Sequence, residues 1–185
     1  MSKEQYIFEK KLVNYCAPTL MKQKAGSMFH VYKQEFEDIN KLVNDYNDKL
    51  SNNHLVIRIL QQHQERITLY IYHPLLINKC LKDHRIIDLL KSYDYPLTNI
   101  EQIINHLDRR LNNNSYPHEI GVFLGYPIND VLDFINKRPC LYTSYWKVYH
   151  NVDNSIKRFN LFNRSKEHLL SYLKTGKSCL NILKN

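Results

Sequence analysis

The sequence predicts an α+β fold, with a small, mainly antiparallel sheet of about four strands, helices packed on that sheet, and a helix-rich C-terminal half. Two runs of β-favouring residues lie close together within residues 55–72, and several other segments carry apolar side chains at helical spacing. The two kinds of segment follow one another irregularly. Such a mixture favours an α+β architecture over a doubly wound parallel sheet, in which strands and helices alternate regularly.

The clearest strand pattern covers residues 67–72, where one set of side chains is aliphatic and the alternating set is threonine and tyrosine. A period of two predicts a half-buried strand. A second β-rich run covers residues 55–60, and the polar residues 62–65 separate the two runs, so we expect an antiparallel hairpin. Residues 28–32 and 142–149 supply the other two candidate strands.

Helical spacing of apolar side chains predicts helices over 4–15, 35–50 and 152–174, and two short helices within 75–93. The first helix is expected to break at residues 16–19, because Pro18 disfavours a helical conformation for the residue before it.

Three local signals set the expected boundaries of the helices in the middle of the chain. Thr98 and Glu101 have the spacing of a capping box at a helix start. Pro117 suits the first turn of a further helix, which Gly125 would close. Pro127 then begins the next helix.

Length and composition predict a single globular domain spanning residues 1–185. No apolar run reaches the roughly 18 residues that cross a bilayer, and the N-terminal residues lack the apolar core of a signal peptide, so no membrane partner is expected. The four cysteines form no Cys-x-x-Cys pair and are read as free thiols, which favours a cytoplasmic location. The net charge of +8 leaves nucleic acid open as a partner without favouring it, because the basic residues are spread along the chain.

Cys16 lies where the first helix is expected to break, and this makes it the first candidate catalytic residue. A thiol near a helix end can be exposed and ionised, and the thiolate is the reactive form. The alternative is a buried structural cysteine, which is the commoner fate of a lone cysteine.

His118 and Glu119 are the other two candidate catalytic residues, and both fall in the first turn of the expected helix. A helix N-terminus disfavours the imidazolium form, and a neutral imidazole can act as a base. The alternative is that Glu119 stabilises the helix dipole while His118 caps or packs. Neighbouring helix residues point about 100° apart, so the two side chains do not share one face.

The segment 118–138 also has the spacing of a helix-turn-helix. Gly121 and Gly125 match its small residue and its turn glycine, and Val131 and Phe134 match two apolar anchors. Against a DNA-binding role, the second helix carries two aspartates near its start, where contacts to phosphates and bases are expected.

Tyr145, Trp146 and Lys147 form, with Tyr126, a candidate ligand-binding set. Tyrosine and lysine on one strand face suit an anionic or planar ligand. The alternative is a packed strand with Trp146 in the core and tyrosines at its edge.

The nine histidines and four cysteines show none of the spacings of zinc sites, so no metal site is predicted, and the cofactor, if there is one, stays unknown.

Three stretches together resemble a family of uncharacterised proteins from anaerobic, low-GC Gram-positive bacteria, known as a domain of unknown function. They are Cys16-Ala17-Pro18-Thr19-Leu20, the run from Pro117-His118-Glu119-Ile120-Gly121 to Pro127, and Tyr145-Trp146-Lys147-Val148-Tyr149. The resemblance spans most of the chain and implies no activity, substrate or cofactor.

The leading hypothesis is therefore a ligand or thiol-based catalytic site in which Cys16 is the nucleophile or redox thiol, His118 its base and Glu119 an orienting carboxylate. A DNA-binding or regulatory module using residues 118–138 is the first alternative. A structural or protein-interaction domain is the second, in which the same motifs only specify the fold.

Overall fold

The computed structural model of the chain describes residues 1–112 and 116–184. Its internal contacts divide the chain into two compact units. Unit 1 consists of Met1–Pro74 and Phe162–Asn185, and unit 2 consists of Leu75–Leu161. The expectation of a single domain stays a prediction.

Unit 1 is built on a three-stranded antiparallel sheet with the strand order β1-β3-β2. The strands are β1 (Gly26–Tyr32), β2 (Val56–His63) and β3 (Arg66–Tyr72). β2 and β3 form the hairpin that the sequence predicts, with a register shift between Ile59 and Gln61. The chain thus builds its main sheet from two of the strands expected around residues 55–72 and the one expected near residue 28.

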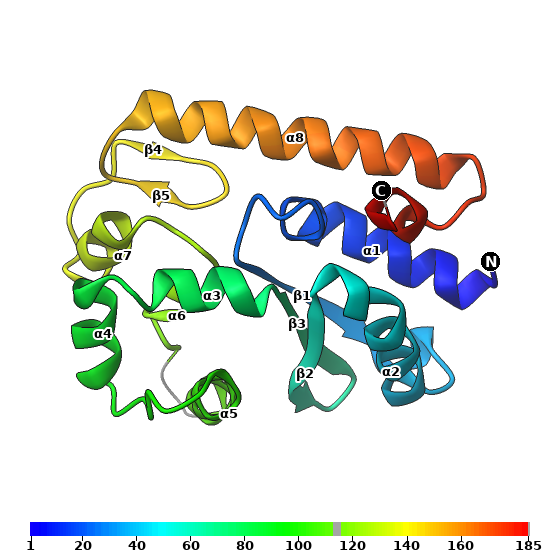
Figure 1. Ribbon diagram of the computed structural model, residues 1–185, viewed down its shortest axis with the longest axis horizontal. Coiled ribbons are helices and arrows are strands. Elements are labelled where there is room, and N and C mark those ends of the chain that lie inside the picture. The colour runs from blue at the N-terminus through cyan, green and yellow to red at the C-terminus, as the bar shows by residue number, and fades with distance from the viewer. Residues whose placement is uncertain (113–115, 185) are drawn as a thin grey trace. The chain divides into compact units, whose positions relative to one another are not determined.

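Two helices, α1 (Lys3–Leu20) and α2 (Ile39–Leu50), cover one face of this sheet, as Figure 1 shows. Their apolar faces and the facing side of the sheet share one core, which includes Phe8, Leu12, Phe29, Tyr46, Ile57 and Leu69. The 3-10 helices of unit 1 are Lys33–Glu35, Ser51–Asn53 and Cys179–Lys184, and the last of these brings Cys179 and Leu180 into the same core.

The expected break of the first helix at residues 16–19 is wrong, because α1 continues through Pro18 to Leu20. Pro18 lies in the last turn, so its missing N–H removes only one hydrogen bond of the helix. Burial of the apolar side chains from Cys16 to Leu20 outweighs that loss, since each fully buried aliphatic side chain contributes about 1.5–3 kcal/mol.

The expectation that β3 is half-buried is also wrong, since every residue from Ile67 to Tyr72 is buried. β3 is the central strand of the sheet. Its second face carries Tyr70 and Tyr72, whose rings stack with centroids 4.9 Å apart. Period-two alternation therefore marks two different apolar faces here rather than a core face and a solvent face.

Unit 2 consists mainly of short helices. They are α3 (Pro74–Cys80), which begins at the boundary of unit 1, α4 (His84–Lys91), α5 (Ile100–Leu111), α6 (Ile120–Phe123) and α7 (Ile128–Ile135). The N-cap of α5 is Asn99, whose side chain accepts from the backbone N–H of Gln102, so the expected capping box on Thr98 is wrong. Asparagine caps helices at least as well as threonine, and here it stands one residue nearer the helix.

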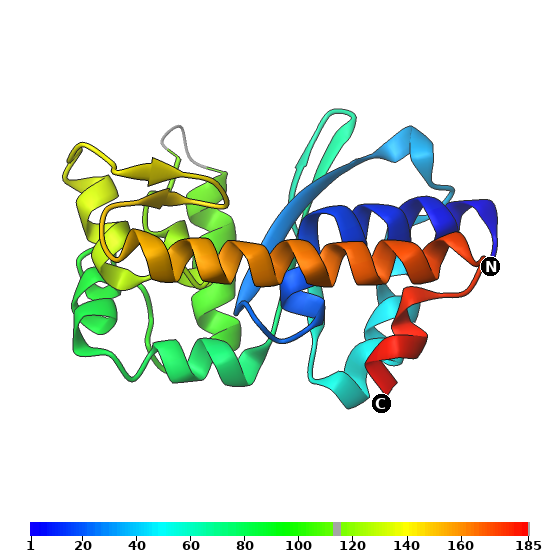
Figure 2. The same ribbon diagram turned by 90° about the horizontal axis from the view of Figure 1, so that it is seen from above.

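The strand expected over residues 142–149 is instead a tight hairpin of two very short strands, β4 (Tyr142–Thr143) and β5 (Lys147–Val148). The following helix, α8 (Val152–Lys174), has the predicted bounds, and its residues up to Leu161 belong to unit 2. Figure 2 shows the hairpin beside the first turns of α8, where the ring of Phe159 packs against Tyr142, Tyr145 and Trp146. The α+β class is confirmed, with separate antiparallel sheets of three and two strands.

Candidate functional site

Unit 2 contains a cavity of about 200 Å³ between the α6–α7 pair and the β4–β5 hairpin. Four aromatic side chains line it, from Tyr116, Tyr126, Phe134 and Trp146. The polar side chains in its wall are His118, Asp130 and Lys147. A concave site with a mostly apolar lining and a few convergent polar groups is the usual form of a small-molecule site.

The two glycines of this segment allow α6 and α7 to meet closely. Gly125 has a φ of 68°, a left-handed conformation that costs glycine nothing and lets the chain reverse between the helices. A Cβ atom on Gly121 would lie 2.8 Å from Val131 Cγ2 and 3.2 Å from Tyr126 Cδ2. A larger residue at position 121 would therefore displace Val131 and Tyr126, which both line the cavity.

Asp130 joins α7 to the hairpin. Its Oδ2 accepts a hydrogen bond from Trp146 Nε1 at 2.8 Å, and its Oδ1 accepts from the backbone N–H groups of Tyr149 at 2.9 Å and His150 at 3.1 Å. The residue is 2% exposed, so this buried carboxylate needs all three donors. These bonds hold the indole of Trp146 against the cavity.

Tyr126 and Trp146 form one aromatic wall, with ring centroids 5.2 Å apart and planes inclined by 29°. The Tyr126 hydroxyl donates to the backbone carbonyl of Tyr145 at 3.1 Å. Burial raises the pKa of Tyr126 to about 12, with a smaller contribution from Tyr116, so the phenol remains a neutral donor. Both rings are thus held in place by hydrogen bonds within unit 2.

Phe134 stands at the exposed edge of the cavity between two basic side chains. The residue is 37% exposed. The His118 ring meets it edge-to-face at 5.2 Å, and Lys147 Nζ lies 5.3 Å from its centroid. An imidazole and an ammonium group therefore flank the same apolar ring.

The cavity brings together four of the seven sequence candidates, namely His118, Tyr126, Trp146 and Lys147. Tyr145 takes part through its carbonyl, while its ring stacks on Phe159 at 5.5 Å. Trp146 and Lys147 both line the cavity although they are adjacent, because the hairpin is too short to impose strand alternation on them.

Asp130 and Phe134 also line this cavity, although the sequence did not mark them as candidates for the site. In the sequence, Asp130 is indistinguishable from an acidic residue that stabilises the first turn of a helix. Phe134 is indistinguishable from an apolar residue that packs a helix against the core. The hydrophobic spacing of α7 held the only signal for Phe134, and nothing in the sequence links Asp130 to Trp146, which lies sixteen residues away.

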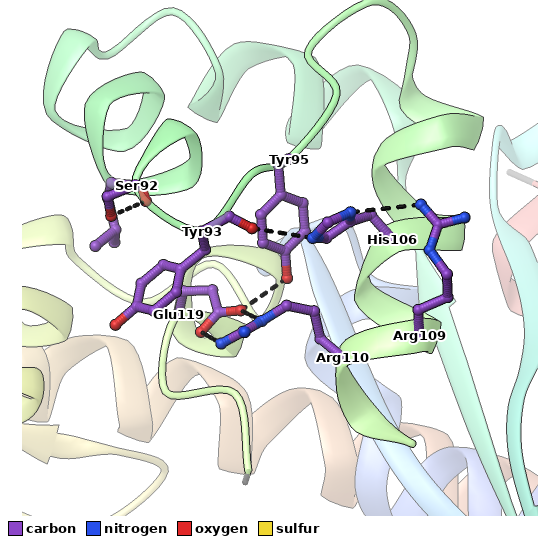
Figure 3. Close-up of polar contacts among 8 residues, drawn as sticks. Ser92, Tyr93, Tyr95, His106, Arg109, Arg110 and Glu119 are labelled. Atoms are coloured by element: carbon purple, nitrogen blue, oxygen red, sulfur yellow. Dashed lines mark hydrogen bonds and ion pairs between the residues drawn. The ribbon is translucent and has the colours of Figure 1, made fainter. Parts of the chain in front are cut away.

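Glu119 belongs to a different cluster of unit 2, shown in Figure 3. Its carboxylate is fully buried and accepts from Tyr95 Oη at 2.9 Å and from Arg110 Nε at 2.6 Å, with a longer contact of 3.3 Å to Arg110 Nη2. The Arg110 guanidinium also lies over the Tyr93 ring, 4.7 Å from its centroid. Burial and the nearby Glu119 charge raise the pKa of Tyr95, which keeps its hydroxyl a donor.

His118 and Glu119 lie before α6, in a turn closed by the Ile120 N–H and the Pro117 carbonyl at 3.2 Å. The helix expected to begin at Pro117 therefore begins only at Ile120. In this turn His118 lines the cavity while Glu119 points at Arg110 and Tyr95. The carboxylate is thus committed to a buried ion pair.

Cys16 lies in the core of unit 1 with no exposed surface, whereas His118 belongs to unit 2. Burial raises the pKa of the Cys16 thiol strongly, and the charge of Lys24 only partly opposes this. The thiol is therefore un-ionised at neutral pH, which does not favour a nucleophilic role. The catalytic set of Cys16, His118 and Glu119 stays a prediction.

Within residues 1–112 and 116–184, no group of three or more His, Cys, Asp or Glu side chains is placed to hold a metal ion. None of the helices in the same part of the chain has both the length and the apolar character needed to cross a membrane.

A family model described as "Protein of unknown function (DUF3793)" matches residues 12–183. No curated protein and no solved structure matches the chain.

Proposed function

The chain belongs to this family of unknown function, and because the family's description assigns no activity, we propose a function from the geometry of unit 2: the protein binds a small molecule with a planar ring in the aromatic cavity. The observation that carries the proposal is the convergence of Tyr126, Phe134 and Trp146 on one cavity of about 200 Å³. A dry engineered cavity of about 150 Å³ holds benzene, so this space suits one substituted ring.

The hydrogen bonds of the site support binding because they preorganise it. Asp130 orients Trp146, and the Tyr145 carbonyl orients Tyr126, so both rings are already in place. A site whose side chains are held before binding loses less conformational entropy when the ligand enters. A purely structural role for the same residues would not require an open aromatic cavity.

The test uses Trp146, which is the chain's only tryptophan and therefore reports on this cavity alone. Phenylpropionamide, a neutral probe with one ring, is expected to change tryptophan fluorescence saturably. Phe134→Ala is expected to weaken its binding about fivefold to tenfold, because an aromatic contact contributes about 0.5–1.5 kcal/mol beyond burial.

Leu141→Ala is the matched control, because Leu141 is 68% exposed on the same hairpin and does not line the cavity. It should bind the probe like the parent protein. If Phe134→Ala and Leu141→Ala had equal effects, or if tryptophan fluorescence did not respond to any one-ring probe, the cavity would not be the binding site.

A DNA-binding module is the second candidate, favoured by the close approach of Gly121 to Val131 and by the left-handed conformation of Gly125 between α6 and α7. The charge of unit 2 does not favour DNA binding, since its eleven Lys and Arg residues are nearly balanced by nine Asp and Glu residues. Of the two acids of α7, Asp130 is buried and Asp133 pairs with His150 at 2.7 Å.

A gel-shift experiment with duplex DNA at low salt separates the two candidates. We expect no retardation at concentrations that saturate the ring probe. Retardation that falls steeply with salt and that is lost on replacing Lys137 and Arg138, which follow α7, would instead favour the DNA-binding role.

The proposed setting is the cytoplasm of a bacterium. All four cysteines are free thiols, including the exposed Cys140, which fits a reducing compartment.

A further inference from the structure

We infer that the ligand of the aromatic cavity is an anion, specifically a small aromatic carboxylate, whose charged group binds at Lys147. The inference rests on the proposed function and narrows it. Three features carry it: the position of Lys147, the neutralisation of Asp130 in the cavity lining, and the contact of the Trp146 ring with an internal cation.

Among the described residues that line the cavity, Lys147 is the one lysine or arginine, and its exposure places it at the entrance. Its Nζ lies 5.3 Å from the centroid of the Phe134 ring, on which His118 also packs. A ligand ring entering beside Phe134 would leave its carboxylate at this entrance. There the ammonium group, which donates three hydrogen bonds, and a ring N–H of His118 are within reach.

Asp130 is the acidic residue among those that line the cavity. Its negative charge does not favour the binding of a cationic ligand. Both of its oxygens accept hydrogen bonds from unit 2 itself, namely from the Trp146 indole and from two backbone N–H groups. Arg158 also lies close enough to Asp130 for a coulombic attraction. The carboxylate is therefore compensated inside the protein wall.

Arg158 already makes a cation–π contact with the Trp146 ring, although it does not line the cavity. Its guanidinium carbon lies 5.0 Å from the centroid of the Trp146 ring. Aromatic sites bind ammonium ligands by placing the cation over such a ring. Because Trp146 already has an internal cation beside it, and the Lys147 ammonium group of the lining would repel a second one, the cavity disfavours ammonium ligands.

The test compares three probes of nearly equal shape: phenylpropionate, phenylpropionamide and phenylpropylammonium, each titrated against the fluorescence of Trp146. The carboxylate is expected to bind about tenfold more tightly than the amide, as one charge-assisted hydrogen bond at a partly hydrated site would give. The ammonium probe is expected to bind more weakly than the amide.

Lys147→Gln is expected to bring the affinities for carboxylate and amide within about twofold of each other, chiefly by weakening the binding of the carboxylate. The urea unfolding midpoint of the variant, followed by the fluorescence of Trp146, shows that it is folded. Lys157→Gln removes the same charge from an exposed position of α8 outside the cavity, and it should keep the preference for the carboxylate.

The outcomes distinguish this inference from the proposed function. If the three probes bind equally, if the ammonium probe binds best, or if the preference for the carboxylate survives Lys147→Gln, the inference is overturned while the cavity remains a ligand site. If none of the probes changes the fluorescence of Trp146, the proposed function fails, and this inference fails with it.

Discussion

Replacing Glu119 by glutamine is expected to destabilise unit 2, because it leaves the Arg110 guanidinium without its counter-charge. In the parent protein the Glu119 carboxylate is fully buried and holds Arg110 Nε at 2.6 Å and Tyr95 Oη at 2.9 Å. Glutamine keeps the shape of the side chain. It can accept from only one of its two terminal positions, and its NH₂ group would then face one of the donors that now point at the carboxylate.

The size of the effect follows from the burial of the two partners. Removing one partner of a buried ion pair costs about 3–5 kcal/mol. The Arg110 side chain is 23% exposed, so water can solvate part of its charge in the variant. We therefore expect a loss of about 2–3 kcal/mol in the free energy of unfolding of unit 2. Arg110→Met is expected to cost more, since the carboxylate that it leaves behind has no access to water.

The assay is urea unfolding followed by the fluorescence of Trp146, which reports on unit 2. A double-mutant cycle with Arg110→Met should give a coupling energy of about 2 kcal/mol, because the double variant contains neither charge. Glu101→Gln makes the same chemical change at an exposed site and should stay within about 0.5 kcal/mol of the parent.

An unchanged or raised stability of Glu119→Gln would refute this reasoning. It would instead favour the catalytic role of Glu119 that the sequence suggests, since catalytic groups are often held at the expense of stability.

Three further predictions concern the thiols, the phenols and the hairpin. Iodoacetamide should modify the exposed Cys140 in the folded protein and spare Cys16, because burial raises the pKa of the Cys16 thiol. Rapid labelling of Cys16, found by mass mapping, would contradict this. The stability of unit 2 should fall as the pH rises from 10 to about 12, because Tyr126 loses its proton in the unfolded chain at a lower pH than in the folded protein. The unfolded state then binds fewer protons than the folded state. A flat stability profile across this range would be inconsistent with a buried phenol. Asp130→Asn should cost about 2–4 kcal/mol and shift the emission of Trp146 to longer wavelength, because an amide cannot accept from all three donors; an unchanged unfolding midpoint would count against this account of the hairpin.

Local pattern predicted the place of several elements correctly. Helix α8 begins and ends where its apolar spacing indicates, and the hairpin of β2 and β3 forms at the predicted place. The predictions failed where a distant contact outweighs a local signal, as at Pro18, where burial of the last turn in the core keeps the helix intact.

The candidate ligand residues were found from sequence because aromatic and basic side chains gather in short segments around positions 118, 126 and 146. Their arrangement was not predictable in the same way. The pairing of Asp130 with Trp146 joins residues sixteen apart, and the pairing of Glu119 with Arg110 joins residues nine apart across the segment between two helices.

The sequence by itself determined the α+β class, most of the helices and the kinds of side chain available for a site, because hydrophobic periodicity is a property of neighbouring residues. Only the tertiary structure decided which of these side chains face a cavity, which are sealed in a core and which neutralise one another. Burial and pairing depend on the faces that folding brings together. Cys16 lost its access to solvent, and Glu119 gained a counter-charge, through contacts that no local pattern contains.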